Sequence, residues 1–498
     1  FPGSRYYHCF ADQKNSADYA YAFGVNEFVL CASAYQPWID KYPGSTAGGK
    51  HYCLNRNNTY WEYSRPFWDY QARCSALMRK GVPVVDICVY LGQNPPVKLV
   101  TYRLPEIPEG YDFDVCTAEA LVGRTMAVDG RLTLPTGISY SLLVIQRNND
   151  MPLHVLRHIA GLVKGGVIVC GPRPDGSDSL KDKAESEEYR ALVDELWGEL
   201  TTVSQIRKVG KGKIYENIPL SEVLKYENIR PDIAIKSGNT AKDKVYFVHR
   251  RLSDADVYFL NNHSDRAFHD TIRLRTDARQ AEYWDAVTGQ RYMIPVKASG
   301  EKGMLLNLTL APRESGFIVT SNNQATGLLP RIADVQETIT PIEGSWNVYF
   351  DPRWGGPGKV VFDELIDWTV HADTGIRYYS GTAVYHKELN LAMPAQNERL
   401  LLRFPRLGSL ARVWVNGKEV VTVWCSPWEA DITSYVHEGK NNLKIEVVNS
   451  LMNRMIGDAS LPESERFTYA YPQIATPTDK LVPSGIMEQL NLVYRQCQ

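Results

Sequence analysis

The sequence predicts a multidomain protein in which α/β segments at the N-terminal side are followed by β-sandwiches. At 498 residues the chain is long enough for about three or four domains of ordinary size. Helical and strand-like segments alternate up to about residue 236, and short strands separated by turns dominate from there to the end. These observations place the expected domains at residues 1–81, 82–236, 237–322 and 323–498.

Residues 1–81 read as helix, strand, long loop, helix and strand. A helix over residues 11–23 ends at Gly24, a short apolar run over 28–32 has the composition of a buried strand, and a helix over 68–80 ends at Gly81 before a strand over 83–90. This order is that of a (β/α) barrel, but it supplies only about two of the eight units. Residues 1–81 are therefore either the C-terminal part of such a barrel or a different fold.

Residues 82–236 continue the alternation in a form that predicts a flavodoxin-like α/β domain. The expected strands cover 84–91, 131–134, 140–145 and 167–170, and the expected helices cover 115–122, 152–164 and 185–199. A helix that passes through Gly165 and Gly166 into an apolar strand is typical of a βαβ unit with a parallel sheet. The loop at 171–176 lacks the spacing of a phosphate-binding loop, which argues against nucleotide binding.

After residue 237 the pattern predicts two antiparallel β-sandwiches. Strands at 245–250, 256–261, 270–275, 280–285, 304–310 and 316–320 are short and separated by turns, and residues 270–275 alternate with a period of two. A polar linker at 321–327 precedes the second sandwich, whose strands we expect at 344–350, 382–389, 398–404, 410–415, 419–424 and 442–448. Asn416-Gly417 stands where a hairpin needs a type I′ turn.

Composition narrows the possible functions. Apolar residues make up 44% and charged residues 22%, and 55 basic residues against 57 acidic ones give a net charge of -2, so there is no electrostatic case for nucleic acid or an anionic membrane. No apolar run approaches the ~20 residues of a membrane span. The nine cysteines form no C-x-x-C pair and predict neither a zinc site nor a disulfide framework. Phe1 is not an initiator Met, so we expect the native N-terminus to lie upstream.

The candidate binding site is an aromatic and polar stretch between residues 35 and 61. Flat aromatic rings beside amide, imidazole and guanidinium groups suit a sugar, which has apolar ring faces and a rim of hydroxyls. We expect Trp38 and Trp61 to stack on the sugar and the polar members to bind its hydroxyls. The predicted set is Tyr35, Gln36, Trp38, His51, Arg56, Asn57 and Trp61. The alternative is a core edge in which the aromatics only pack.

Several motifs resemble known sugar-active enzymes. Trp-Asn-Val-Tyr-Phe at 346–350, Leu-Ile-Asp-Trp at 365–368, Ala-Arg-Val-Trp-Val-Asn-Gly-Lys at 411–418 and the stretch at 448–458 are similar to a family 2 type sugar-binding sandwich, which is jelly-roll-like and galactose-binding-like. Gly-Val-Asn-Glu-Phe-Val at 24–29, Ala-Tyr-Gln-Pro-Trp at 34–38, Gly-Tyr-Asp-Phe-Asp at 110–114 and Trp-Asp-Ala-Val-Thr-Gly at 284–289 resemble, with these, glycoside hydrolase family 106, the α-L-rhamnosidases. The resemblance spans essentially the whole chain.

This resemblance implies inverting hydrolysis of terminal α-L-rhamnose from an oligosaccharide or polysaccharide. It also implies a Ca²⁺ ion, whose ligands it does not place here, and a bacterial protein that is periplasmic or secreted. The family pair of catalytic glutamates would lie upstream of Phe1, where the rest of the barrel would also lie, so the catalytic residues are unknown on this chain. Glu27 and Glu62 lie near the candidate rim, and we interpret them as solvated or supporting residues.

Two departures from the family pattern keep other functions open. Tyr35 stands where the family usually has His, and Gln93 where it tends to have Glu. Both favour a non-catalytic carbohydrate-binding protein derived from such an enzyme. A purely structural surface protein that reuses the sandwiches is a third possibility.

Overall fold

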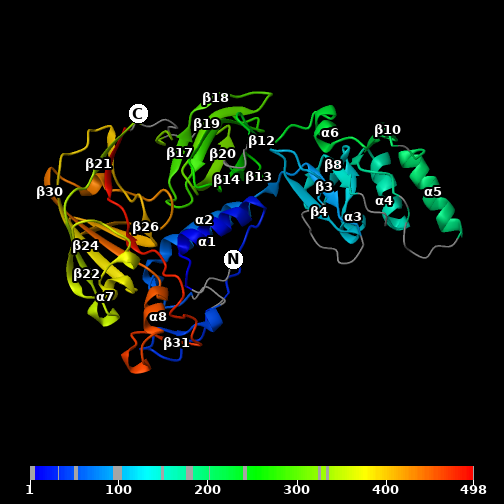
Figure 1. The fold of residues 1–498 in the computed structure, drawn as a ribbon. Coiled ribbons are helices and arrows are strands. Elements are labelled where there is room, and N and C mark those ends of the chain that lie inside the picture. The colour runs from blue at the N-terminus through cyan, green and yellow to red at the C-terminus, as the bar shows by residue number, and fades with distance from the viewer. Residues whose placement is uncertain are drawn as a thin grey trace.

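The computed structural model describes residues 6–31, 33–49, 54–92, 104–146, 151–174, 176, 183–200, 202–238, 244–323, 327–331 and 336–496. Figure 1 shows three sheet-containing regions side by side: the C-terminal sandwich, the first sandwich and the α/β region. Two N-terminal helices, α1 (Phe10–Ala22) and α2 (Arg65–Met78), lie between the two sandwiches. The expectation of a multidomain chain built mostly of sheet is confirmed.

Helices α1 and α2 form a common core with both sandwiches. Tyr21 and Tyr70 are fully buried and pack with Phe259 of the first sandwich and Trp424 of the second. As predicted, the first helix stops at Gly24, which adopts a left-handed φ of 87° that a residue with a Cβ rarely takes. The helix pair thereby fixes the two sandwiches relative to each other.

The predicted buried strand at 28–32 is not a strand. Its described residues, 28–31, are irregular, and the side chains of Val29 and Leu30 are 96% and 45% exposed. A strand needs a neighbour that accepts and donates backbone hydrogen bonds, and no described strand pairs with this segment. Between the helices the chain instead forms the short β1 (Pro43–Ser45), which pairs in parallel with β31 (Tyr469–Tyr471), and the single turn η2 (Trp61–Tyr63).

The α/β region holds a six-stranded sheet with the order β10-β11-β9-β8-β3-β4, in which every pairing except β10 with β11 is parallel. Its strands are β3 (Ile87–Tyr90), β4 (Phe113–Cys116), β8 (Leu142–Ile145), β9 (Ile168–Cys170), β10 (Gln205–Val209) and β11 (Gly212–Glu216). Helices α3 (Ala118–Arg124), α4 (Leu153–Lys164) and α5 (Lys183–Trp197) pack into the core on one side, and α6 (Leu220–Tyr226) contributes to a second core cluster. A small antiparallel sheet is formed by β5 (Met126–Val128), β6 (Arg131–Thr133) and β7 (Ser139–Tyr140).

One predicted element of this region begins too early. The helix expected at 115–122 starts only at Ala118, because residues 113–116 pair with β3 as an edge strand. Thr117 separates the two elements, and its hydroxyl caps the helix by accepting a hydrogen bond from the amide of Ala120 at 3.4 Å.

The first sandwich packs two sheets around Tyr258, Tyr283 and Ile318, all fully buried. The larger sheet contains β17 (Arg291–Ile294), β16 (Gln280–Trp284), β20 (Ser315–Ser321), β14 (Ala255–Asn262), β13 (Val245–Arg251) and β2 (Val82–Pro83). The smaller sheet contains β12 (Ile233–Ile235), β15 (Phe268–Leu274), β19 (Met304–Leu310) and β18 (Val296–Ala298).

The second sandwich has a core centred on Trp346, Trp368 and Tyr385. One sheet contains β23 (Gly358–Phe362), β22 (Trp346–Phe350), β24 (Thr382–Leu391), β30 (Gly439–Val448), β27 (Leu410–Val415) and β28 (Lys418–Val423). The other contains β21 (Glu337–Pro341), β33 (Asn491–Gln496), β25 (Glu398–Arg403) and β29 (Glu429–Asp431). The remaining elements are β26 (Leu407–Gly408), β32 (Gly485–Ile486), α7 (Thr374–Arg377) and α8 (Met452–Asp458).

The hairpin predicted at Asn416-Gly417 is confirmed. Both residues have positive φ, 51° and 78°, and they join β27 to β28 as a type I′ turn requires.

Candidate functional site

The polar residues of the predicted sugar site hold a loop together. The amide group of Gln36 donates to the carbonyl of Ser45 and accepts from its N–H, both at 2.8 Å. Asn57, which is buried, donates to the carbonyls of Lys41 and Pro43 at 3.0 and 3.3 Å. The structure thus brings these two predicted residues together, with their hydrogen bonds directed to the backbone.

Arg56 and Trp38 belong to the same loop. The guanidinium of Arg56 donates to the carbonyl of Trp38 at 3.2 Å. The Trp38 ring packs edge-on against Tyr469, with centroids 5.0 Å apart, and Lys41 lies over it. The contact between Trp38 and Tyr469 joins two segments that are more than 400 residues apart in sequence. The pairing of β1 with β31 joins the same two segments.

The other predicted residues are more accessible or lie elsewhere. Tyr35 is 84% exposed and Trp61 is 36% exposed, so both rings can meet a ligand. Trp61 begins η2, which rests on the second sandwich because Arg412 donates to the carbonyl of Glu62 at 2.9 Å. His51 lies outside the described residues. A role in sugar binding for these seven residues stays a prediction.

Exposed apolar side chains gather in this part of the chain. Of the large hydrophobic residues that are exposed among the described ones, eight fall between residues 19 and 61: Tyr19, Phe23, Val25, Val29, Leu30, Tyr35, Ile39 and Trp61. Tyr19 and Phe23 pack with Tyr246 of the first sandwich, at centroid distances of 5.2 and 5.8 Å, and the other six leave apolar surface exposed in this part of the chain.

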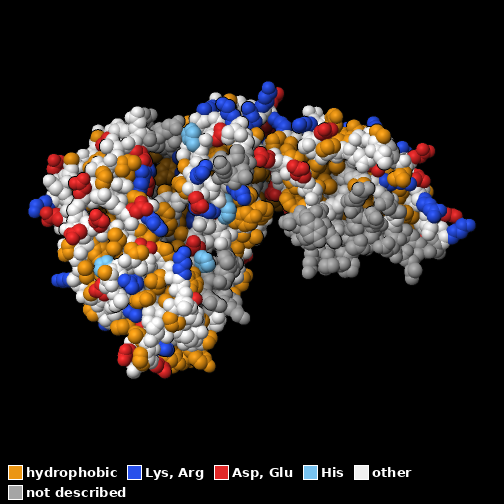
Figure 2. All heavy atoms as spheres, in the orientation of Figure 1, with side chains coloured by type: hydrophobic (Ala, Val, Ile, Leu, Met, Phe, Trp, Pro, Cys, Tyr) orange, Lys and Arg blue, Asp and Glu red, His pale blue; other side chains and the backbone are white. Residues whose placement is uncertain are grey.

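A second feature, absent from the sequence-based expectations, is a cleft of about 990 Å³ between the two sandwiches. Figure 2 shows the molecule hollowed between these domains, with charged side chains around the opening. Its charged lining consists of Arg313, Arg331, Arg399, Arg403, Arg495, Asp265, Asp285, Glu314, Glu337 and Glu429. We call this hollow the intersandwich cleft.

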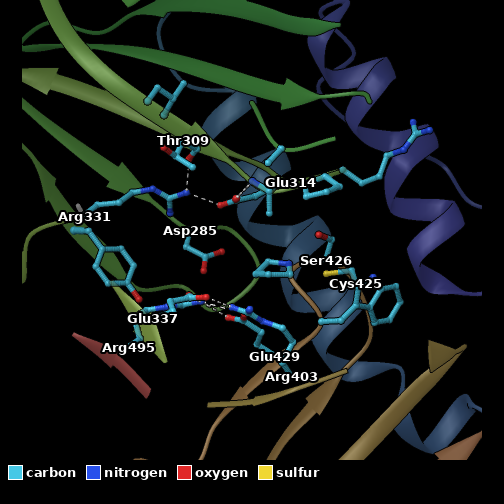
Figure 3. Close-up of a pocket in the computed structure, with 18 of the residues that line it drawn as sticks. Asp285, Thr309, Glu314, Arg331, Glu337, Arg403, Cys425, Ser426, Glu429 and Arg495 are labelled. Atoms are coloured by element: carbon cyan, nitrogen blue, oxygen red, sulfur yellow. Dashed lines mark hydrogen bonds and ion pairs between the residues drawn. The ribbon is translucent and has the colours of Figure 1, made fainter. Parts of the chain in front are cut away.

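One wall of the intersandwich cleft is the outer face of the sheet β21-β33-β25-β29 (Figure 3). Strand register places Glu337 opposite Arg495 and Arg403 opposite Glu429. Arg403 contacts Glu337 and Glu429 at 2.8 and 2.6 Å, and Arg495 contacts the same two carboxylates at 2.7 and 2.9 Å. The four side chains therefore form a closed network of alternating charge.

The opposite wall carries a separate pair from the first sandwich. Arg331 binds Glu314 at 2.6 Å and lies over the ring of Tyr283, 3.5 Å from its centroid. The hydroxyl of Tyr283 also donates to Glu314 at 2.8 Å. Figure 3 shows Arg331 and Glu314 facing the arginine–glutamate network across the cleft.

Neighbouring arginines lower the pKa of two glutamates of the cleft, Glu337 and Glu314. Burial raises the pKa of Glu337, but hydrogen bonds from Arg403 and Arg495 outweigh it and hold the pKa below its usual value. Burial likewise raises the pKa of Glu314, but the charge of Arg331, together with hydrogen bonds from Arg331, Tyr283 and a backbone amide, holds the pKa below its usual value. Hydrolysis of a glycoside requires one carboxyl that stays protonated, and a lowered pKa does not suit these two glutamates to that role.

Sequence reasoning could not find the intersandwich cleft. Half of its charged residues lie on the four strands β21, β25, β29 and β33, where strand register brings them to one face, and the other half lie in loops of the first sandwich and at Arg331. Among the described residues no three His, Cys, Asp or Glu side chains lie close enough to hold a metal ion. None of the described helices has the length and apolar character needed to cross a membrane.

Comparison with known proteins matches two parts of the chain to families. The family described as alpha-L-rhamnosidase, glycoside hydrolase family 106, matches residues 3–297, and the sugar-binding domain of glycosyl hydrolases family 2 matches residues 333–494. The solved structure of a rhamnosidase from Novosphingobium sp. PP1Y is similar over 99% of this chain and 47% of its own, with a TM-score of 0.89 and 28% identity. A curated protein of Formosa agariphila that carries a β-glucuronidase name is 23% identical over 91% of this chain and 57% of its own length. The chain thus spans about half the length of these relatives.

Proposed function

We propose, from the premise that the chain belongs to the α-L-rhamnosidase family of glycoside hydrolases, that the whole protein removes terminal α-L-rhamnose from glycans with inversion of configuration. The observation that supports this most directly is the similarity to a solved rhamnosidase over 99% of the chain. The substrate would be an oligosaccharide or polysaccharide of plant or bacterial origin.

The catalytic pair belongs, in this proposal, to a segment upstream of Phe1. An inverting enzyme uses two carboxyl groups ~6.5–9.5 Å apart, one protonated and one ionised. The relatives are about twice as long as this chain, which leaves room for such a segment. We further propose that residues 1–81 are the end of its (β/α) barrel, since the exposed apolar residues between Tyr19 and Trp61 offer a surface for the missing strands.

The flavodoxin-like classification of residues 82–236 is also a proposal. Numbered along the chain, the parallel strands β3, β4, β8, β9 and β11 lie in the order 2-1-3-4-5. This order is that of flavodoxin-like sheets.

The loop at 35–61 would form one side of the sugar site. Gln36 and Asn57 fix its backbone through the hydrogen bonds described above, and Tyr35 and Trp61 present accessible rings that can stack on a sugar. Export to the periplasm or medium, and a Ca²⁺ ion, are parts of this proposal that rest on the family alone.

The test is hydrolysis of 4-nitrophenyl α-L-rhamnoside by the full-length protein. We expect turnover, and we expect nuclear magnetic resonance to show β-L-rhamnose as the first product because inversion changes the anomer. An α-L-rhamnose first product would refute inversion, and no turnover of any α-L-rhamnoside would refute the enzyme.

Substitution of Tyr35 tests, in the same assay, whether the loop at 35–61 contacts the substrate. Tyr35→Ala should lower kcat/KM about tenfold, which is the effect of losing roughly 1.4 kcal/mol of transition-state contact. Val370→Ala is the control, because Val370 is 71% exposed in the second sandwich and is not part of the predicted site. Equal activity of both variants would remove Tyr35 from the site.

A non-catalytic carbohydrate-binding protein is the second candidate. It is favoured by Tyr35 at the position where the family usually has His, and by Gln93, which lies outside the described residues, at the position where the family tends to have Glu. Binding of rhamnose without turnover by the full-length protein would support this candidate.

A further inference from the structure

The intersandwich cleft is balanced in charge. Its lining contains five arginines and five carboxylates, and neither lysine nor histidine. An anionic ligand would meet the carboxylates, and a cationic ligand would meet the arginines. A neutral ligand that both donates and accepts hydrogen bonds can use both kinds of group, and sugar hydroxyls do so.

The charged side chains are fixed in place and still accessible. In the network of Arg403, Arg495, Glu337 and Glu429, and in the pair Arg331–Glu314, the side chains are between 12% and 31% exposed. Mutual ion pairs hold them before any ligand arrives, which lowers the entropy cost of binding. Arg403 uses Nε for Glu429 and Nη2 for Glu337, so its Nη1 is not used in this network and can donate to a ligand.

The cleft also offers apolar surface for the faces of a sugar ring. Trp428 and Tyr292, both partly buried, and Leu329, which is 54% exposed, line it together with the charged groups. Aromatic rings pack against the apolar faces of sugars while nearby polar groups bind the rim. The volume of about 990 Å³ lies at the upper end of the range for small-ligand sites, enough for several linked sugars.

We propose that the intersandwich cleft is a second glycan-binding site, which binds a neutral oligosaccharide and holds it without cleaving it. The site lies between two sandwiches of the described chain, and it does not depend on the activity proposed above. Such a site would hold one part of a polysaccharide on the protein while another part of the same polysaccharide is hydrolysed at the catalytic site.

The experiment is isothermal titration calorimetry of the full-length protein with neutral hexasaccharides of galactose, arabinose and xylose, and with oligogalacturonate as the anionic probe. These neutral probes carry no terminal rhamnose, so a rhamnose-specific catalytic site does not bind them. We expect at least one neutral probe to bind and oligogalacturonate not to bind.

Two substitutions locate the binding. Leu329→Trp places a larger side chain in the cleft and should weaken oligosaccharide binding at least tenfold. Asn15→Arg, on α1, places a larger side chain in another part of the cleft lining and should weaken binding to a similar extent. Met393→Trp is the matched control, since Met393 is 49% exposed in the second sandwich and lies outside the cleft. Turnover of 4-nitrophenyl α-L-rhamnoside should be equal in all three variants.

The outcomes separate the two proposals. Binding of no neutral probe, binding of oligogalacturonate alone, or wild-type affinity in both cleft variants would overturn the second site. Absence of rhamnoside turnover in the unsubstituted protein would refute only the proposed enzyme activity. The proposal of a second glycan-binding site would still be decided by the calorimetry.

Discussion

Asp112 is a carboxyl whose environment favours its protonated form. Burial, together with the charges of Asp114 and Asp232, raises its pKa to about 7, although the amide of Phe113 donates to it at 2.8 Å. The unfolded chain would bind this proton only near the ordinary pKa of about 3.9. Between these values the folded state holds more protons, so this residue contributes stability at low pH that is lost as the pH rises toward 7.

The substitution Asp112→Asn should remove this pH dependence. Asparagine keeps an oxygen that can accept from the Phe113 amide but has no charge to bury. We expect the melting temperature of the variant, relative to the unsubstituted protein, to be higher at pH 8 than at pH 5. Asp363→Asn, at an exposed position, is the control, and the same difference at both pH values in Asp112→Asn would contradict the assignment.

The segment at 28–31, the described part of the strand predicted at 28–32, is where sequence and structure disagree. Its apolar composition is that of a buried strand, but in the described chain Val29 is 96% exposed and no strand lies beside it. If the upstream barrel strands pair with this segment in the full-length protein, Val29 becomes buried there.

The substitution Val29→Asp tests whether the segment around Val29 is exposed to solvent or covered by other strands in the full-length protein. In the full-length protein it should lower the free energy of unfolding by at least about 2 kcal/mol, because a charge would replace a buried apolar side chain. Val370→Asp, at a position that is 71% exposed, should have little effect. Denaturant unfolding followed by fluorescence measures both, and equally small effects would show that nothing covers Val29.

At the scale of the whole molecule, Arg275 joins the α/β region to the first sandwich. It follows β15, and its guanidinium contacts Asp86 before β3 and Asp232 before β12, both at 2.6 Å. Asp232 in turn binds His249 at 2.8 Å. Both carboxylates are almost fully buried, and Arg275 is the nearest cation to each, since Arg131 lies 3.7 Å from Asp86.

Arg275→Met should therefore destabilise the protein by about 3–5 kcal/mol, the cost of leaving a buried charge without its partner. Arg273→Met is the control, because Arg273 lies two residues earlier, on β15, and is exposed. Urea unfolding of the two variants is the measurement. A similar midpoint for both would mean that the junction between the domains does not rely on Arg275.

The predictions that the structure confirms are those that depend on residues close together in sequence. Helix α1 with its terminal Gly24, the hairpin at Asn416-Gly417 and the alternating strand β19 each depend on neighbouring residues, and each was predictable. Strands β10 and β21 were missed because their side chains are largely polar or exposed, so no apolar period marks them. Their place is set by pairing with β11 and β33.

The sequence by itself determined the order of α/β and β regions, the main turns and, through its motifs, the family to which the chain belongs, because these are written in local patterns. Only the tertiary structure decided that Gln36 and Asn57 bond to their own loop, that Asp112 is partly buried near other carboxyls, and that a charge-balanced cleft lies between the sandwiches. The physical reason is that burial, pKa and complementary charge depend on residues brought together by strand register and domain packing, whose separation along the chain leaves no local signal.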